Sequence, residues 1–236
     1  MDDAISFMHS LESKYKKVSG LDSRAWYKIF YCQVRPAPIL QLGINPGGDP
    51  QNTSSDGCRH FTGETAASSQ GYYENGEHDL LDCDWRENVG LKKLLMPIVG
   101  SQEKIRSTVV KSNLAFRRSS KATKINIKQA KAEAVPFLKD MIRRVAPRVV
   151  ILTGDTVTDF CGVFGEAFRI IEEPQREPGT GQVILEAGTC KLTPNEESLV
   201  VRVAHASQFN WIYDRFEVGP RILVLMQKIG IQFGNG

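Results

Sequence analysis

Residues 38–48 read PILQLGINPGG, and this stretch sets the expected fold and the expected site. The apolar run from Ile39 to Leu42, bounded by proline and glycine, is typical of a short buried strand. Pro46 cannot continue a strand, and the glycines after it allow a sharp turn and close approach of a ligand. Asn45 is therefore expected just past the carboxyl end of a strand, where open α/β sheets bind ligands. The alternative is a simple turn in which Asn45 bonds only to its own backbone.

The composition is that of an ordinary globular protein, with 236 residues, 41% of them hydrophobic and 24% charged. The net charge of +3 does not by itself indicate a nucleic-acid partner. The five cysteines are scattered without a C-x-x-C pair, which argues against a disulfide framework, a zinc site and an iron–sulfur cluster. The N-terminal sequence MDDA lacks the apolar core of a secretory signal, and no stretch is long enough to span a membrane. We therefore expect a cytoplasmic protein, or a nuclear one in a eukaryote.

Further apolar runs predict a single three-layer α/β/α domain over residues 1–236, with a mainly parallel four-stranded central sheet. Besides the first strand, strands are expected within residues 106–116, 148–154 and 199–204. Helical spacing predicts N-terminal helices within 1–35, at residues 2–17 and after a Ser23 cap, and further helices at 89–98, 125–146, 155–164 (with Asp155 as cap) and 215–229. Residues 183–185 fit either an edge strand or one arm of a hairpin with residues 189–192.

Residues 48–88 are rich in Gly, Ser, Thr, Asp and Asn and lack periodicity. A loop of this length in a domain is usually functional or disordered. Because it follows Asn45 directly, it is expected to form the wall or lid of a pocket, with Phe61 as a wall residue between two glycines. The alternative is a flexible surface insertion.

Two further polar residues are expected at the same sheet edge as Asn45. Asn113 lies near the end of the second strand, and His205 directly follows the last one. For Asn113 the alternative is a turn or cap asparagine, and a lone histidine is often purely structural. The most basic run of the chain begins just after Asn113 and comprises Arg117, Arg118, Lys121, Lys124, Lys128 and Lys131. It fits either a solvated helix face or a patch that contacts phosphates, with Arg117 and Arg118 nearest the site.

Two amides and one imidazole permit a limited chemistry. An asparagine cannot take up a proton, but its carbonyl oxygen can orient a water molecule, and a histidine can stabilise a departing anion by donating a hydrogen bond. A second asparagine presents a donor and an acceptor side by side, which suits the edge of a nucleobase. The strand ends carry no nucleophile elbow and no paired carboxylates, so acyl transfer and carboxylate-pair hydrolysis are disfavoured. The set favours hydrolysis of an N-glycosidic bond.

These motifs resemble those of the uracil-DNA glycosylase superfamily. The likeness rests on GINPG at residues 43–47, SNL at 112–114, the strand at 149–154 and HAS at 205–207, and it covers roughly residues 38–211. The first motif is similar to that of the mismatch-specific and single-strand-selective monofunctional branches. The histidine that opens the last motif is more similar to the single-strand-selective branch.

The resemblance implies a monofunctional DNA glycosylase of base-excision repair that removes uracil or a related damaged base from DNA. The cysteine pattern of the iron–sulfur branch is absent, so no cluster is expected, and no metal, other cofactor or membrane partner is expected either. Asn45 would position the hydrolytic water and His205 would stabilise the departing base. The residues expected to bind the base are Gly43, Ile44, Pro46, Gly47, Phe61 and Asn113. The residues expected to contact DNA are Ser207, Gln208 and Phe209, with Phe209 as a wedge in the duplex, beside Arg117 and Arg118.

One departure from the family pattern keeps other functions open. The last motif of the family is usually His-Pro-Ser, and Ala206 stands where the proline would be. This difference favours a catalytically impaired nucleic-acid-binding member of the same fold as an alternative. A hydrolase of free nucleosides or nucleotides is a further alternative, and it would need no wedge.

Overall fold

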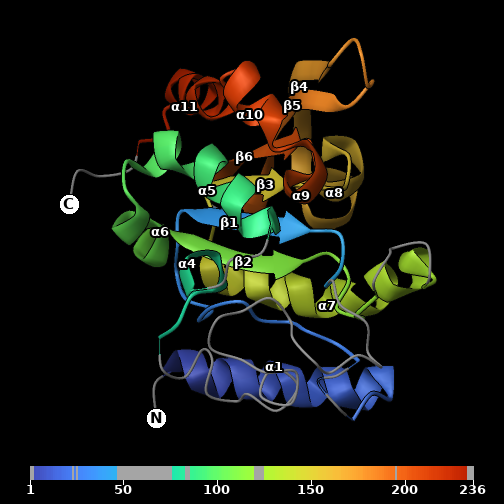
Figure 1. Cartoon of the computed structure of the whole chain (residues 1–236). Coiled ribbons are helices and arrows are strands. Elements are labelled where there is room, and N and C mark those ends of the chain that lie inside the picture. Colours follow the sequence, from blue (N-terminus) through green and yellow to red (C-terminus); the bar gives the residue numbers. More distant parts are fainter. Residues whose placement is uncertain are drawn as a thin grey trace.

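A mixed sheet of six strands, in the order β2-β1-β3-β6-β5-β4, forms the centre of the computed structural model (Figure 1). The structure describes residues 3–22, 24, 26–46, 76–82, 86–119, 125–194 and 196–232. The strands are β1 Ile39–Gly43, β2 Val109–Asn113, β3 Val149–Leu152, β4 Glu166–Arg176, β5 Val183–Thr193 and β6 Glu196–Val203. The strands β2, β1, β3 and β6 are parallel to one another, and β5 and β4 continue the sheet as antiparallel neighbours.

The α/β class and the mainly parallel sheet are confirmed, but the expected number of four strands is wrong. The difference is the long hairpin formed by β4 and β5, which pairs through β5 with β6. Strand β5 is buried over most of its length, whereas β4 at the edge is largely exposed and carries charged residues. The alternation that identifies a half-buried strand is therefore missing from β4. Residues 183–185 and 189–192 form neither an edge strand nor two arms of a hairpin, because both belong to the single strand β5, whose hairpin partner is β4.

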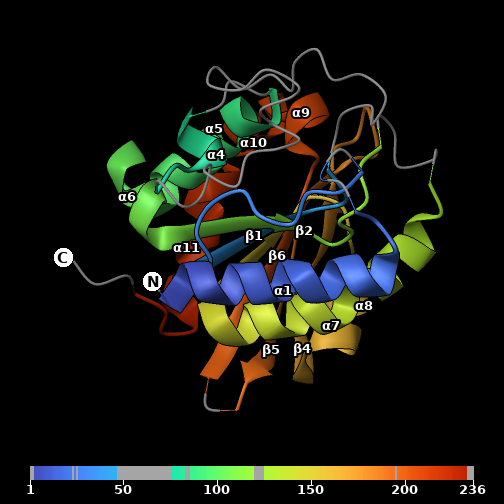
Figure 2. The same cartoon turned by 90° about the horizontal axis from the view of Figure 1, so that it is seen from below.

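Helices cover both faces of the sheet, so the chain forms three layers (Figures 1 and 2). The helices of the described residues are α1 Asp3–Ser19, α4 Asp79–Asp82, α5 Arg86–Val99, α6 Gln102–Thr108, α7 Ile127–Val145, α8 Val157–Phe164, α9 Ala206–Phe209, α10 Trp211–Arg215 and α11 Val218–Lys228. Helices α1 and α7 lie side by side on one face, and α5 and α11 pack together on the other. None of these helices is long and apolar enough to cross a membrane.

Successive residues of each strand point to opposite faces of the sheet and belong to two hydrophobic clusters, one on each face. Leu40 and Leu42 face the cluster that contains α1 and α7, whereas Ile39 faces the cluster that contains α5 and α11. This alternation follows from the period of two along a strand, and it explains why the parallel strands are apolar throughout. Burial on both faces fixes the register and so places every strand end at a defined point of the sheet edge.

The principal helices follow local signals. Asn126 caps α7 by accepting a hydrogen bond from the backbone N–H of Gln129, and the helix ends at Ala146, whose φ is 48°, just before Pro147. This agrees with the helix expected over 125–146. Helix α8 is capped by Thr156 rather than by Asp155 as expected, because the Thr156 hydroxyl accepts from the backbone N–H of Asp159.

The expected second N-terminal helix is wrong. Residues 26–37 instead run along the outer edge of β2, where the hydroxyl of Ser112 donates to the carbonyl of Ile29 at 2.7 Å, and past its end, where Lys28 donates its backbone N–H to the carbonyl of Phe116 at 2.9 Å. Ile29 and Phe30 are buried in this extended segment, while Trp26 is 46% exposed. The spacing of these apolar residues indicated a helix, but the segment satisfies its hydrogen bonds by covering the sheet edge.

Two other expected boundaries change. Within residues 48–88, Asp79–Asp82 form α4 and α5 begins at Arg86, so this part is not a loop. Residues 47–75 and 83–85, which include the predicted pocket residues Gly47 and Phe61, lie outside the described residues. The expected helix 215–229 is divided at Glu217, whose φ of 48° separates α10 from α11.

Candidate functional site

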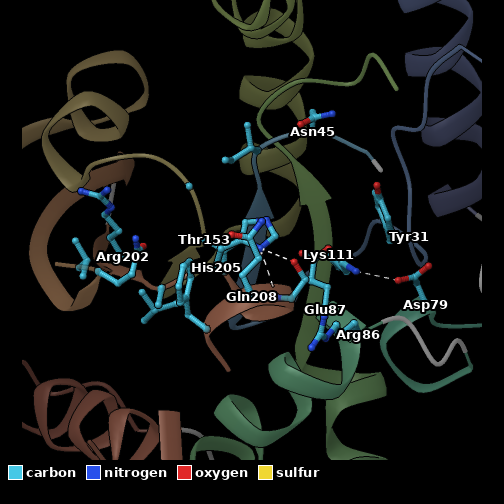
Figure 3. A pocket seen from close by; sticks show the side chains of 18 of the residues that line it. Tyr31, Asn45, Asp79, Arg86, Glu87, Lys111, Thr153, Arg202, His205 and Gln208 are labelled. Carbon is cyan, nitrogen blue, oxygen red and sulfur yellow. Dashed lines mark hydrogen bonds and ion pairs between the residues drawn. The ribbon is translucent and has the colours of Figure 1, made fainter. Parts of the chain in front are cut away.

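The parallel strands end at a cavity of about 720 Å³. Residues that follow β1, β3 and β6 line it, namely Ile44–Asn45, Thr153–Gly154 and Ala204–His205 (Figure 3). The other lining residues are Lys28, Tyr31, Asp79, Arg86, Glu87, Lys111, Arg118, Ser119, Gln182, Val183, Arg202, Val203, Ser207, Gln208 and Phe209. The cavity thus lies where the sequence predicted it, outside the carboxyl ends of the strands.

The turn after β1 is held by backbone hydrogen bonds to the chain that follows β2. Gly43 accepts from the N–H of Leu114 at 2.8 Å, and Ile44 accepts from the N–H of Ala115 at 2.9 Å. Pro46 accepts from the N–H of Ser119 at 3.1 Å. These bonds fix residues 43–46 on a rigid support, as a binding site requires.

Asn45 is half-buried, and its amide group has a defined orientation. The Nδ2 atom donates to the carbonyl of Pro46 at 3.0 Å and lies 3.5 Å from the carbonyl of Ser119. The bond to Pro46 is the local backbone contact of the turn interpretation, and it coexists with the position of Asn45 in the cavity wall. Because the NH₂ group is used by the backbone, the Oδ1 atom remains as the acceptor that could orient a water molecule.

His205 caps the short helix α9, and this contact fixes its tautomer. Its Nδ1 accepts from the backbone N–H of Ser207 at 3.4 Å and lies 2.9 Å from the hydroxyl oxygen of Ser207. A backbone N–H can only donate, so Nδ1 carries the lone pair and the proton of the neutral ring is on Nε2. In this tautomer His205 can donate a hydrogen bond from Nε2 to a ligand.

Asn113 is brought to the same sheet edge but is not among the residues that line the cavity. It is buried, and its Nδ2 atom donates to the hydroxyl of Tyr31. Its Oδ1 atom lies over Gly43, where an added Cβ would be only 2.3 Å away. The sequence predicted that Asn113 lies at the same sheet edge as Asn45 and His205. It could not show that this amide bonds to Tyr31, which lines the cavity while Asn113 does not.

A buried ionic cluster forms one wall of the cavity, and sequence reasoning missed it. The ammonium group of Lys111 lies 2.9 Å from the carboxylate of Asp79 (Figure 3). It also donates to the side-chain oxygen of Asn88 at 2.6 Å. Lys28 binds the other carboxylate oxygen of Asp79 at 3.1 Å. Although burial opposes ionisation, Lys111 and Lys28 lower the pKa of Asp79, and Asp79 raises the pKa of Lys111 despite its desolvation. The available signal was a lysine directly after the two valines of β2, at a position where a strand residue is buried.

Further charged side chains reach the cavity from elements outside the parallel strands. Arg86 and Glu87 come from the first turn of α5, and Arg202 comes from β6, where it lies 3.4 Å from the carboxylate of Glu186. Glu87 was not predicted as a site residue, because the helix was expected to begin at residue 89 and actually begins at Arg86. The cavity therefore holds both acceptor and donor groups around its apolar patches.

The residues expected to contact DNA separate into two groups. Arg117 forms an ion pair with Glu133 at 2.8 Å and does not line the cavity, whereas Arg118 does. In the same basic run, Lys131 pairs with Asp155 at 3.0 Å, while Lys121 and Lys124 lie outside the described residues. These ion pairs favour the structural interpretation for part of the run.

The segment after His205 borders the cavity. Ser207, Gln208 and Phe209 all line it, and Gln208 is exposed. Phe209 is half-buried and packs against the core cluster on the α5 face of the sheet. Part of its ring therefore contacts the core. To act as a wedge in a duplex, Phe209 would have to move out of this contact.

The described residues contain no group of three or more His, Cys, Asp or Glu side chains placed to bind a metal ion. No protein-family model matches the chain, and no curated protein sequence matches it either. The function proposed for the chain therefore rests on its motifs and on the geometry of the cavity.

Proposed function

We propose that the protein is a monofunctional DNA glycosylase that hydrolyses the N-glycosidic bond of uracil or a related damaged base. The observation that carries this proposal is that Asn45 and His205 line one cavity in complementary hydrogen-bonding states. The Asn45 carbonyl is left as an acceptor for water, and the Nε2–H of His205 is left as a donor for the leaving base. The motifs that resemble the uracil-DNA glycosylase superfamily support the same assignment.

The reaction needs few groups because the bond to the base breaks early. The electron pair of the C1′–N bond leaves with the base, the water oxygen bonds to C1′, and one proton of the water passes to solvent. Asn45 places the water, and His205 donates a hydrogen bond to a carbonyl oxygen of the base as negative charge develops there. No lysine is assigned as a Schiff-base nucleophile, so we expect an abasic site as product without strand cleavage.

Base release from labelled oligonucleotides tests the proposal. The protein is incubated with single- and double-stranded substrates that contain uracil, hypoxanthine or an oxidised pyrimidine, and alkali then cleaves any abasic sites. We expect release from at least one substrate, strong loss in Asn45→Ala and His205→Ala, and no loss in Lys93→Ala, whose ion pair with Asp214 lies on the surface. Inactivity of the wild-type protein on all three bases would defeat the proposal. Salt-sensitive DNA binding without release would then indicate the impaired, nucleic-acid-binding alternative.

A hydrolase of free nucleotides is the second candidate, and two observations favour it. Phe209 packs partly against the core. Three arginines, Arg86, Arg118 and Arg202, are among the residues that line the cavity, and arginine suits a free phosphate, although Arg202 also faces Glu186. Phe209→Ala separates the two functions. For the glycosylase, this change should impair release from a duplex more than from a single strand. For the nucleotide hydrolase, it should leave release of the base from uridine or deoxyuridine monophosphate unchanged.

A further inference from the structure

The side chain of Asn113 is committed to contacts inside the protein. Its amide NH₂ donates to the Tyr31 hydroxyl, and its carbonyl oxygen lies against Gly43. Of the two residues, only Tyr31 lines the cavity. A ligand therefore meets the phenol before it can meet the amide.

Tyr31 is held rigidly at this position. Its backbone carbonyl accepts from the N–H of Asp79 at 2.8 Å, and its ring faces the ammonium groups of Lys28 at 4.2 Å and Lys111 at 4.8 Å. Figure 3 shows the hydroxyl on the end of the ring that points away from Asp79. Cation–π contacts on a buried ring restrict its rotation, so the hydroxyl has a fixed place in the cavity wall.

The hydroxyl of Tyr31 is available to donate a hydrogen bond to a ligand. Its oxygen accepts from Asn113, and among the described residues no acceptor is found for its own hydrogen. Burial, followed by the charge of Asp79, raises the pKa of Tyr31 well above its usual value of 10, so the hydroxyl keeps its proton at neutral pH. A rigid donor in a cavity wall complements a carbonyl oxygen of a ligand.

We infer that Tyr31 is the residue that hydrogen-bonds to the edge of the bound base, and that Asn113 is the positioning residue that orients its hydroxyl. This inference rests on the proposed function and deepens it. A base that carries a carbonyl group at this edge receives a hydrogen bond, whereas a base that carries an amino group there leaves the phenol hydrogen unpaired. The site would thus discriminate between carbonyl-bearing and amino-bearing bases through a phenol supplied from outside the parallel strands.

Single-turnover base release by Tyr31→Phe, Asn113→Leu and the double variant tests the inference. Tyr31→Phe keeps the ring and removes the hydroxyl, so we expect about a tenfold lower rate on uracil and a weaker preference for uracil over cytosine. Asn113→Leu should also lower the rate on uracil and the preference for uracil over cytosine. The double variant should be little slower than Tyr31→Phe, because the two residues act as a unit. Tyr15→Phe is the matched control, since it removes a buried hydroxyl for which the described residues offer no hydrogen-bond partner, and Tyr15 belongs to α1 and packs in the core away from the cavity lining.

The outcomes separate this inference from the proposed function. If the wild-type protein releases uracil but Tyr31→Phe keeps both its rate and its base preference, the role of Tyr31 is refuted and the glycosylase stands. If the wild-type protein releases no base, the glycosylase falls, and binding of free uracil is measured by calorimetry instead. Binding that weakens about tenfold in Tyr31→Phe and is unchanged in Tyr15→Phe would support the inference. Absent or equal binding would overturn it.

Discussion

The side-chain oxygen of Asn113 fills the space above the Cα atom of Gly43, at the point where β1 and β2 end side by side. A Cβ atom added to Gly43 would lie 2.3 Å from that oxygen, which is closer than any real contact of this kind. Glycine at this place is therefore required by the neighbouring strand and not by an unusual backbone angle. The contact links the first motif of the chain to Asn113 and, through it, to Tyr31.

Gly43→Ala should displace Asn113 and weaken its bond to Tyr31. We expect a loss of about 1–3 kcal/mol in the free energy of unfolding, as for other insertions into packed sites. Gly162→Ala is the matched control, because a Cβ there meets nothing within 4 Å and the residue lies in helix α8. Urea denaturation should show this control to be unchanged or stabilised by up to about 1 kcal/mol. Equal stability of Gly43→Ala and wild type would contradict the tight contact.

His205→Ala should slow base release by about 10²–10³-fold, the usual effect of removing one donor to a developing negative charge. Ser207→Ala removes only the hydroxyl contact to Nδ1 and keeps the backbone N–H that fixes the tautomer, so we expect about a tenfold loss at most. Single-turnover rates at saturating enzyme measure both effects. A larger loss in Ser207→Ala than in His205→Ala would argue against the assigned tautomer.

Lys111→Met should destabilise the fold strongly, because it leaves the buried carboxylate of Asp79 with Lys28 as its remaining cationic partner. Breaking a buried pair in this way typically costs about 3–5 kcal/mol. Lys93→Met removes an exposed ion pair with Asp214 and should cost about 0–1 kcal/mol. Denaturation midpoints of the two variants give the comparison, and similar midpoints would rule out a structural role for the cluster.

His78 should make stability depend on pH. Its Nε2 donates to the carbonyl of Val109 at 2.8 Å, its buried Nδ1 has no partner within the described part of the chain, and burial lowers its pKa from 6.5 to about 4. Between these values the unfolded chain binds a proton that the folded protein does not, so stability is full above pH 6.5 and falls as the pH drops toward 4.

The expected loss across this range is about 3 kcal/mol, from roughly 1.4 kcal/mol for each unit of pKa difference. His78→Gln keeps a donor for Val109 but cannot be protonated, so its unfolding free energy should vary less between pH 7 and pH 4.5. Urea denaturation at the two pH values, on wild type and variant, measures the difference. Parallel pH profiles of the two proteins would show that His78 is not responsible.

The parallel half of the sheet could be predicted because its strands are buried on both faces. Their apolar runs, at residues 39–42 and 149–152 for example, stand out between amphipathic helices such as α7. Because parallel strands end at the same edge of the sheet, the residues that follow them were expected there. Asn45 and His205 do lie at that edge.

The rest depended on contacts between distant segments. Residues 26–37 carry apolar side chains at helical spacing, yet they are extended because they cover the edge of β2. Tyr31 and Asp79 reach the cavity only through this covering segment and α4, and nothing in their local sequence connects them with Lys111. Periodicity reports which face of an element is buried, but it does not report which segment buries it.

The two edges of the sheet are shielded in different ways. At one edge, residues 26–37 lie along β2, and Cys32 accepts from the backbone N–H of Lys111 at 3.4 Å. At the other, β4 pairs with β5 through several register shifts and carries charged side chains on its exposed surface. An irregular, charged edge is a poor template for a strand from another molecule. We therefore expect the folded chain to resist amyloid-like stacking even in concentrated solution.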